Sequence, residues 1–160
     1  MKLVIFSVPK QATSFDTIYV GADFKNLLSL EVCGGFVTDA GVKNIKDLKA
    51  LTLLNLSQNV NLTDKTLELI SGIVLPMPEA RNKFTFSFYS LSLMAIWFTG
   101  LTALVNLNVS NSRVSNAGLK HLNDLQNLRS LSLDSTRVTA NEMRKLRATM
   151  LPNLISMRPE

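Results

Sequence analysis

The sequence holds one cysteine, Cys33, and one histidine, His121. A single cysteine excludes a disulfide within the chain and is typical of proteins from a reducing compartment. Zinc sites need several thiolates or imidazoles, which this chain lacks. We therefore expect neither a disulfide-stapled domain nor a metal centre.

Motifs for nucleotide binding and catalysis are also missing. Neither GxxxxGK[ST] nor GxGxxG occurs, and the Gly34-Gly35 pair is better suited to a tight turn than to a phosphate loop. His121 stands between Leu119 and Leu122, and no serine and carboxylate can be assigned to it as catalytic partners. We predict that the protein is not an enzyme and binds no cofactor.

Charge is sparse and mixed in sign. Charged residues make up 18% of the chain and the formal net charge is +5. The basic residues form no dense stripe with interleaved aromatics, so nucleic acid is not an expected partner. They are mildly concentrated near the C-terminus, at Arg137, Arg144, Lys145, Arg147 and Arg158. The start, MKLVIFSVPKQ, has only six apolar or small residues between Lys2 and Pro9, fewer than the about 7–15 residues of the apolar core of a signal peptide. We expect a cytoplasmic or nuclear protein.

What the sequence does contain is a repeat. Four segments carry the pattern LxxLxL, in which Val sometimes replaces the last Leu. Each pattern is followed by a polar run, an aliphatic residue, a Thr or Ser, and then a helical pattern. They begin at Leu27, Leu51, Leu104 and Leu128. The first and last pairs are 24 residues apart, and the middle pair is 53 apart. Repeats of about 20–29 residues with this spacing are the leucine-rich-repeat signature.

The spacing has a physical explanation. A short strand of period two turns alternate leucines inward, and the Thr or Ser that follows can accept the free N–H groups at a helix start. Thr139 and Glu142 have the spacing of a capping box. One repeat cannot bury its leucines alone, whereas three or more stacked repeats form a continuous core. We predict an α/β leucine-rich-repeat solenoid, with short parallel strands on the concave face, helices on the convex face and one long insert. Helix starts are expected at Thr38-Asp39, Thr63-Asp64, Ser115-Asn116 and Thr139.

Both ends of the array depart from the pattern. The ending LPNLISMRPE begins another LxxL at Leu151, with Ser156 where an inward leucine would stand, and we interpret it as a closing strand. Residues 13–20 resemble a degenerate helical half-repeat. The predicted organisation is therefore a degenerate N-terminal repeat remnant at 1–23 and a leucine-rich-repeat domain at 24–160, with an insert at 73–100.

Four stretches resemble intracellular plant leucine-rich-repeat proteins related to the F-box/leucine-rich-repeat group. They are VTDAGVKNI, NLSQNVNLTDKTLELISG, NVSNSRVSNAGLKHL and VTANEMRKLRATMLPNLISMRPE. The resemblance extends over about two-thirds of the chain, and it implies that the repeats bind a protein partner. In F-box members the repeats capture substrates for ubiquitin ligases, although no F-box-like segment precedes them here. The substrate-recognition part of an SCF-type ubiquitin-ligase adaptor, with ligase components as partners, is therefore an alternative function.

Residues 73–100 interrupt the period. Their excision joins ISG to LTAL and restores the link between helix and strand that IKDLKAL and LNDLQNL show. The insert holds six of the eleven aromatic residues of the chain. Three interpretations are open. The insert is a loosely packed loop, a retained intron that makes a non-functional splice variant, or part of an uncharged stretch, 84–112, that associates with a membrane. The membrane interpretation is the least favoured, because residues 101–112 belong to the third repeat and a span needs about 20 apolar residues.

The concave strand face is the predicted binding surface, as in other solenoids. Its outward positions follow from the register of the four repeats. The candidate partner-binding residues are Ser29, Glu31, Cys33, Leu53, Asn55, Ser57, Asn106, Asn108, Ser110, Ser130, Ser132 and Asp134. We interpret the chain as a protein–protein interaction module that uses this face.

Overall fold

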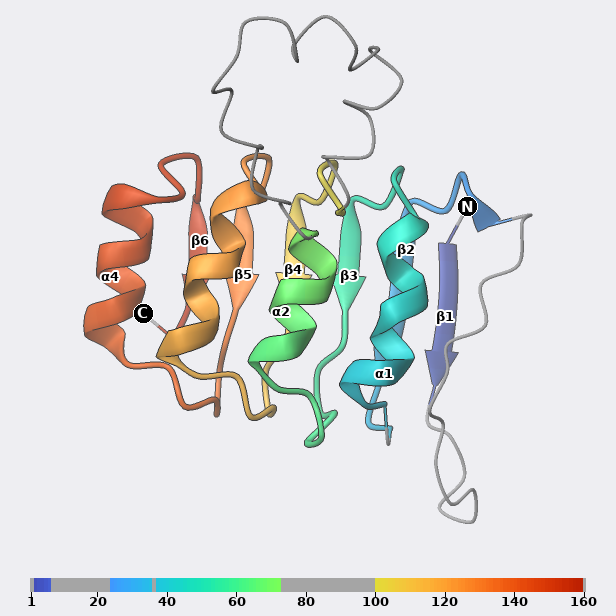
Figure 1. Ribbon diagram of the computed structural model, residues 1–160, viewed down its shortest axis with the longest axis horizontal. Helices are drawn as coiled ribbons and strands as arrows, with labels where there is room; N and C mark the ends of the chain where they lie inside the picture. Colours follow the sequence, from blue (N-terminus) through green and yellow to red (C-terminus); the bar gives the residue numbers. More distant parts are fainter. Residues whose placement is uncertain (1, 7–23, 36, 73–99, 160) are drawn as a thin grey trace, which may run out of the picture.

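The computed structural model describes residues 2–6, 24–35, 37–72 and 100–159. Its strands form one parallel sheet in sequence order, so every strand lies beside the strands of the adjacent repeats (Figure 1). The strands are β1 (Lys2–Phe6), β2 (Ser29–Cys33), β3 (Leu53–Asn55), β4 (Asn106–Asn108), β5 (Ser130–Ser132) and β6 (Ser156–Arg158).

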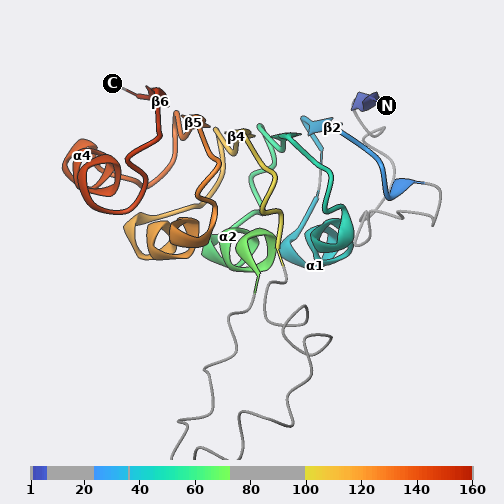
Figure 2. The same ribbon diagram turned by 90° about the horizontal axis from the view of Figure 1, so that it is seen from above.

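A single layer of helices covers one face of this sheet. Figure 2 shows the helices on one side and the strand row curving away from them, so that the free face of the strands is concave. The helices are α1 (Asp39–Val42), the 3₁₀ helix η2 (Lys43–Asp47), α2 (Asp64–Ser71), the 3₁₀ helix η3 (Asn116–Asp124) and α4 (Ala140–Thr149). This architecture is a leucine-rich-repeat solenoid, and the predicted fold class is confirmed.

The repeating leucines form the core. Leu30, Leu54, Leu107 and Leu131 align across the sheet, and each is at most 2% exposed. The buried set also contains residues from the helices, such as Ile45. Burial of one such side chain contributes about 1.5–3 kcal/mol. The pattern of period two in the strands therefore determines which face meets the helices.

The predicted helix starts are confirmed, with side-chain caps at Thr63, Ser115 and Thr139 but none at Thr38. A hydrogen-bond ladder that the sequence does not predict links the helix starts. The main-chain N–H and the hydroxyl of Thr63 both donate to Asp39, at 3.0 and 2.6 Å. Ser115 donates to Asp64 in the same way, at 2.7 Å for both bonds. The N–H of Thr139 donates to Asn116 Oδ1 at 2.8 Å. The residue after each of the first three helix starts thus holds the next repeat in register.

The capping box predicted at the last helix is formed only in part. The N–H of Glu142 donates to Thr139 Oγ1 at 3.5 Å, which is the expected first half. The N–H of Thr139 that the glutamate should accept is already bound to Asn116, and the Glu142 carboxylate lies 3.8 Å from Lys145 Nζ instead. The contact between repeats has replaced the second half of the box.

A left-handed residue ends each strand turn. Gly34, Gln58, Asn111 and Ser135 have φ values of 66°, 63°, 57° and 54° and stand at equivalent places in the four repeats. This conformation aims the N–H of Gly34, Gln58 and Asn111 at a carbonyl of the following repeat, at 2.8–3.1 Å. Only glycine adopts this conformation without steric cost. In the other three residues, steric strain therefore accompanies the turn.

The two ends of the interruption meet within one repeat. The N–H of Leu101 donates to the carbonyl of Ile70 at 2.8 Å. Uninterrupted repeats form the same bond between residues three apart, from Leu48 to Ile45 and from Leu125 to Leu122. A Cβ on Gly100 would lie only 2.1 Å from the Ser71 carbonyl oxygen, which shows how closely the ends approach. Residues 101–112 belong to the third repeat as predicted, and residues 73–99 lie outside the described part of the chain.

Lys49 contacts this junction from the preceding repeat. Its Nζ donates to the Gly100 carbonyl at 3.1 Å. Partial burial lowers the pKa of the Lys49 ammonium, and the nearby Asp47 carboxylate opposes that change. The junction is thus connected to the neighbouring repeat as well as to its own helix.

The predicted register of the last strand is wrong by three residues. Met157, not Leu154, aligns with Leu131, so Ser156 lies beside Ser130 and does not occupy an inward position. The physical reason is the buried leucine that precedes each LxxLxL. Leu151 and Leu154 correspond to Leu125 and Leu128. The N–H of Leu154 donates to the Leu151 carbonyl, just as the N–H of Leu128 donates to the Leu125 carbonyl.

The N-terminal strand was not predicted. β1 pairs with β2 over five residues and adds a sixth strand to the sheet. The helical half-repeat expected at 13–20 lies outside the described residues, so the division at residue 23 stays a prediction.

Removal of residues 73–100, which joins Gly72 to Leu101, should leave the solenoid intact. Shortening a loop of about thirty residues to a few removes about 2 kcal/mol of closure entropy, so the shortened chain should be more stable by about that amount. Thermal unfolding followed by circular dichroism measures this. A control deletion of 73–102 also removes the buried Leu101 and should abolish the sharp transition. Loss of cooperative unfolding in the first deletion would contradict the continuous register.

Replacement of Asp64 by Ala should lower the free energy of unfolding by about 2 kcal/mol, because Ser115 loses an acceptor for two hydrogen bonds to a charged group. Urea unfolding measures the change, and the exposed Asp124→Ala serves as the control. Equal stability of the two variants would show that the ladder does not hold the repeats together.

Candidate functional site

The concave face consists of three rows of side chains that cross the sheet. The outer row contains Ser29, Leu53, Asn106, Ser130 and Ser156, and the amide row contains Glu31, Asn55, Asn108, Ser132 and Arg158. The turn row follows the strands and contains Cys33, Ser57, Ser110 and Asp134. The parallel register gives each row one residue per repeat, so a partner would meet regularly spaced groups.

The rows differ in how far they are exposed. Asn106 and Arg158 are exposed, while most other members are half-buried between their neighbours. Ser110 is the exception at 6% exposed, so its predicted outward exposure is wrong. Its hydroxyl accepts from the N–H of Asp134 at 3.1 Å and so serves the contact between repeats. Ser29 Oγ is buried and has no hydrogen-bond partner within the described residues.

Cys33 is part of the turn row, and its side chain is half-buried. Its half-buried thiol donates to the Asn55 carbonyl at 3.9 Å and accepts from Ser57 Oγ at 3.6 Å. These weak contacts join the first repeat to the second. They are what a small packed side chain would make at this position.

The two asparagines of the amide row have fixed orientations. The N–H of Ser57 donates to Asn55 Oδ1 at 3.1 Å, and the N–H of Ser110 donates to Asn108 Oδ1 at 3.0 Å. Only the oxygen of an amide can accept a hydrogen bond, so each Nδ2 must point the other way. Within the described part of the chain neither Nδ2 has a partner. The amide row therefore offers two unused donor groups on adjacent strands.

Sequence reasoning missed two members of this face. Ser156 and Arg158 extend the outer and amide rows by one strand, and both are exposed. The error in the register of the last strand hid them. The buried leucine at Leu151, which repeats Leu48, Leu101 and Leu125, is the signal that could have revealed them.

Charge is divided unevenly along the solenoid. Residues 100–159 contain eight basic residues (Lys or Arg) and three acidic residues (Asp or Glu). Residues 24–72 contain five basic and five acidic residues. The surplus of positive charge therefore lies in the C-terminal repeats, where the amide row ends on Arg158.

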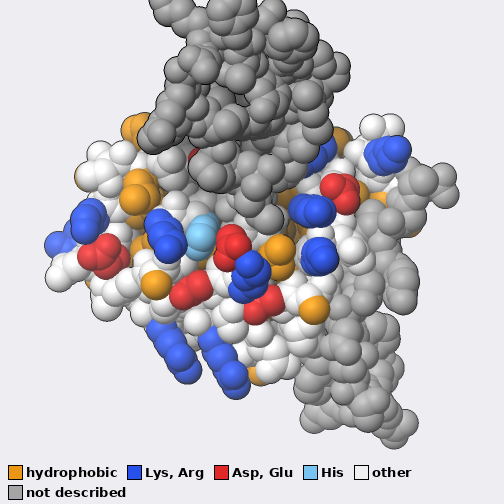
Figure 3. Space-filling view, in the orientation of Figure 1, with side chains coloured by type: hydrophobic (Ala, Val, Ile, Leu, Met, Phe, Trp, Pro, Cys, Tyr) orange, Lys and Arg blue, Asp and Glu red, His pale blue; other side chains and the backbone are white. Residues whose placement is uncertain are grey.

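The described part of the helix face differs from the concave face. In Figure 3 basic and acidic side chains are interspersed over the helices. A hydrogen bond from Lys65 lowers the pKa of Glu68, with His121 and Lys120 contributing smaller effects. The pair is solvent-exposed and so contributes little to stability. This face has the character of a solvated surface.

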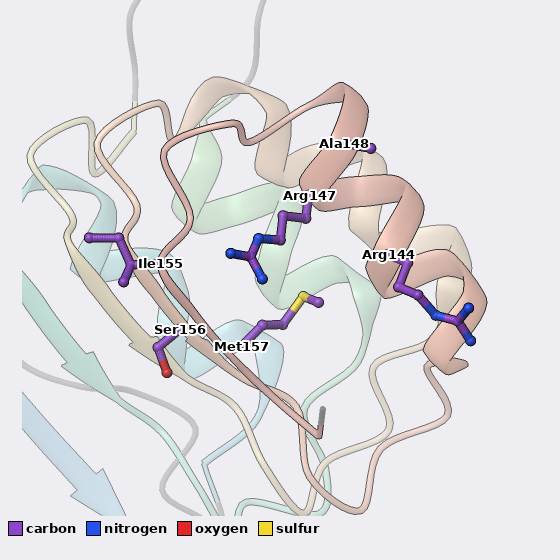
Figure 4. Close-up of a pocket in the computed structure, with 6 residues that line it drawn as sticks. All are labelled: Arg144, Arg147, Ala148, Ile155, Ser156 and Met157. Atoms are coloured by element: carbon purple, nitrogen blue, oxygen red, sulfur yellow. The ribbon is translucent and has the colours of Figure 1, made fainter.

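A hollow lies at the C-terminal end of the solenoid, between α4 and β6. Its lining residues are Arg144, Arg147, Ala148, Ile155, Ser156 and Met157. Figure 4 shows Arg147 and Met157 reaching from the helix and the strand into the space between them. The hollow combines a basic rim with apolar side chains, and Ile155 is 68% exposed.

The described part of the chain contains neither a metal-binding cluster nor a membrane-spanning helix. No group of His, Cys, Asp and Glu among residues 2–6, 24–35, 37–72 and 100–159 could hold a metal ion. No helix in the same part of the chain is long and apolar enough to cross a membrane.

Neither a protein-family model nor a curated protein sequence matches the chain. Solved structures of similar fold include an internalin from Listeria monocytogenes, which is 20% identical, with 87% of this chain and 36% of that chain covered and a TM-score of 0.45. They also include a leucine-rich-repeat protein from Leptospira interrogans, at 21% identity, 82% and 31% coverage and a TM-score of 0.43. The chain spans about a third of the length of these two proteins. Likenesses this distant carry no argument about function.

Replacement of Asn108 by Asp should leave the stability nearly unchanged, because a carboxylate oxygen still accepts from the Ser110 N–H. Asn108→Leu removes the acceptor and should cost about 1 kcal/mol. Urea unfolding of the two variants measures the difference. Equal stability of both would show that the asparagine orientation is not held by this bond.

Proposed function

We propose that the protein is a non-enzymatic interaction module that binds a protein partner through the concave face of the solenoid. The observation that carries this proposal is the set of rows on that face. Side chains such as Asn55, Asn106 and Asn108 recur on neighbouring strands, although the core does not use them. Repeat proteins use such extended concave surfaces for binding. The other large described face, over the helices, carries mixed charge without a regular pattern.

The face is suited to hydrogen-bonded recognition more than to burial of large apolar groups. Its side chains are mainly hydroxyls and amides, with Leu53 as the apolar member. Aromatic anchors, which dominate tight interfaces, do not occur among the row members described on β2 to β6 and in the turns that follow these strands. We therefore expect moderate affinity from several polar contacts.

A second candidate function is the substrate-recognition part of an SCF-type ubiquitin-ligase adaptor in the cytoplasm or nucleus. The observation that favours it is the resemblance of the repeat motifs, such as VTDAGVKNI, to plant F-box/leucine-rich-repeat proteins. The substrate would occupy the same concave face, so the two proposals differ in the additional ligase partner.

A matched pair of substitutions tests the surface. Asn106 and Asn123 are both exposed, but Asn106 lies on β4 and Asn123 on η3. Asn106→Tyr should place a bulky ring on the concave face, while Asn123→Tyr changes the helix side in the same way. Proteins captured by the purified chain should be reduced about tenfold or more by Asn106→Tyr alone, as quantitative mass spectrometry measures.

The identity of the captured proteins separates the two candidate functions. The linker subunit of a ubiquitin ligase among them would support the adaptor function. Capture that Asn106→Tyr leaves unchanged would contradict binding at the concave face.

A further inference from the structure

The amide row presents hydrogen-bond donors over four adjacent strands. Asn55 and Asn108 have their oxygens bound to the main chain, so only their Nδ2 groups face a partner. Ser132 follows on β5 with a hydroxyl, and Arg158 ends the row on β6 with a guanidinium. An arginine side chain donates and cannot accept. From β3 to β6 the row therefore selects for oxygen acceptors.

The positive charge near the end of the amide row also favours a partner that carries oxygen acceptors. Arg158 ends the row, Arg129 is exposed directly before β5, and Arg144 and Arg147 line the hollow beside Ser156 and Met157 of β6. Two acidic members of the rows oppose this charge: Asp134 in the turn row, and Glu31, which neighbours Asn55 in the amide row on β2. Positive potential near the row would attract a negatively charged partner and speed the encounter.

We propose that the amide row from β3 to β6 binds an acidic, extended segment of a partner protein. Carbonyl and carboxylate oxygens of the segment accept from Asn55 and Asn108, and an acidic side chain pairs with Arg158. This inference rests on the proposed function and specifies the chemistry of the partner. An extended segment fits because the donors are arranged in a line across the strands, at the strand spacing of about 4.8 Å.

The test uses a displayed library of random linear peptides selected against the full chain. Selected peptides should be rich in Asp and Glu, and their binding should weaken as salt is added, because salt screens exposed charges. A library that yields no binder enriched in acidic residues would overturn the proposal.

Asparagine-to-aspartate variants then test the donors. Asn55→Asp and Asn108→Asp keep the oxygen that accepts from the main chain but replace the donor with a negatively charged acceptor. Each should weaken binding of the selected peptides at least about tenfold, which corresponds to loss of a hydrogen bond to a charged group. Asn123→Asp on η3 adds the same charge far from the row and should change the affinity less than about twofold. Asp134→Asn should tighten binding.

The outcomes distinguish this inference from the proposed function. If Asn106→Tyr blocks the peptides but the two aspartate variants do not, the concave face binds and the donor row is not what recognises the segment. If Asn106→Tyr has no effect, both proposals fail. If a single-stranded oligonucleotide of mixed sequence binds as tightly as the peptides with the same dependence on Asn108, the partner is a nucleic acid and the inference is overturned.

Discussion

The parallel register between neighbouring strands is the constraint on which the rest of the structure depends. Leu30, Leu54, Leu107 and Leu131 all turn inward at the same height, so the residues on either side of them face out at the same height. A shift by one residue would bury the polar rows and expose the leucines. The candidate binding face is therefore a consequence of the way the core is built.

Polar contacts between repeats reinforce this register beyond the carboxyl ends of the strands, at the turn and at the helix start. The acidic or amide residue at each helix start accepts from the next repeat, as Asp64 does from Ser115. At the turn, the N–H of Gln58 reaches the carbonyl of Ser110. These bonds continue across the interruption, because Asp64 and Ser115 lie on opposite sides of it. Loop closure costs grow slowly with length, which is why a long insert can be accommodated without loss of the stack.

Most of the fold could be predicted from the sequence, because inward leucines and helix-start residues leave strong periodic signals. The spacing of Leu27, Leu51, Leu104 and Leu128 predicted the strands, and the position of the insert followed from the broken period. The last strand was misplaced because the link between helix and strand carries its own leucine, so Leu151 imitates the first leucine of a repeat. The hydroxyl of Ser110 takes part in a hydrogen bond between repeats, and Asn108 is oriented by a bond from the N–H two residues further on; the leucine pattern specifies neither.

Backbone hydrogen exchange tests the continuity of the register most directly. The N–H of Leu101 donates to Ile70 across the interruption, while those of Leu48 and Leu125 form the equivalent bond within uninterrupted repeats. Exchange of these amides should require the same opening free energy if the sheet and its helices are one cooperative unit. Equal protection of Leu101, Leu48 and Leu125 is the predicted result. Rapid exchange at Leu101 and Ser115, with Leu125 still protected, would show that the stack is broken at the interruption and would contradict the account.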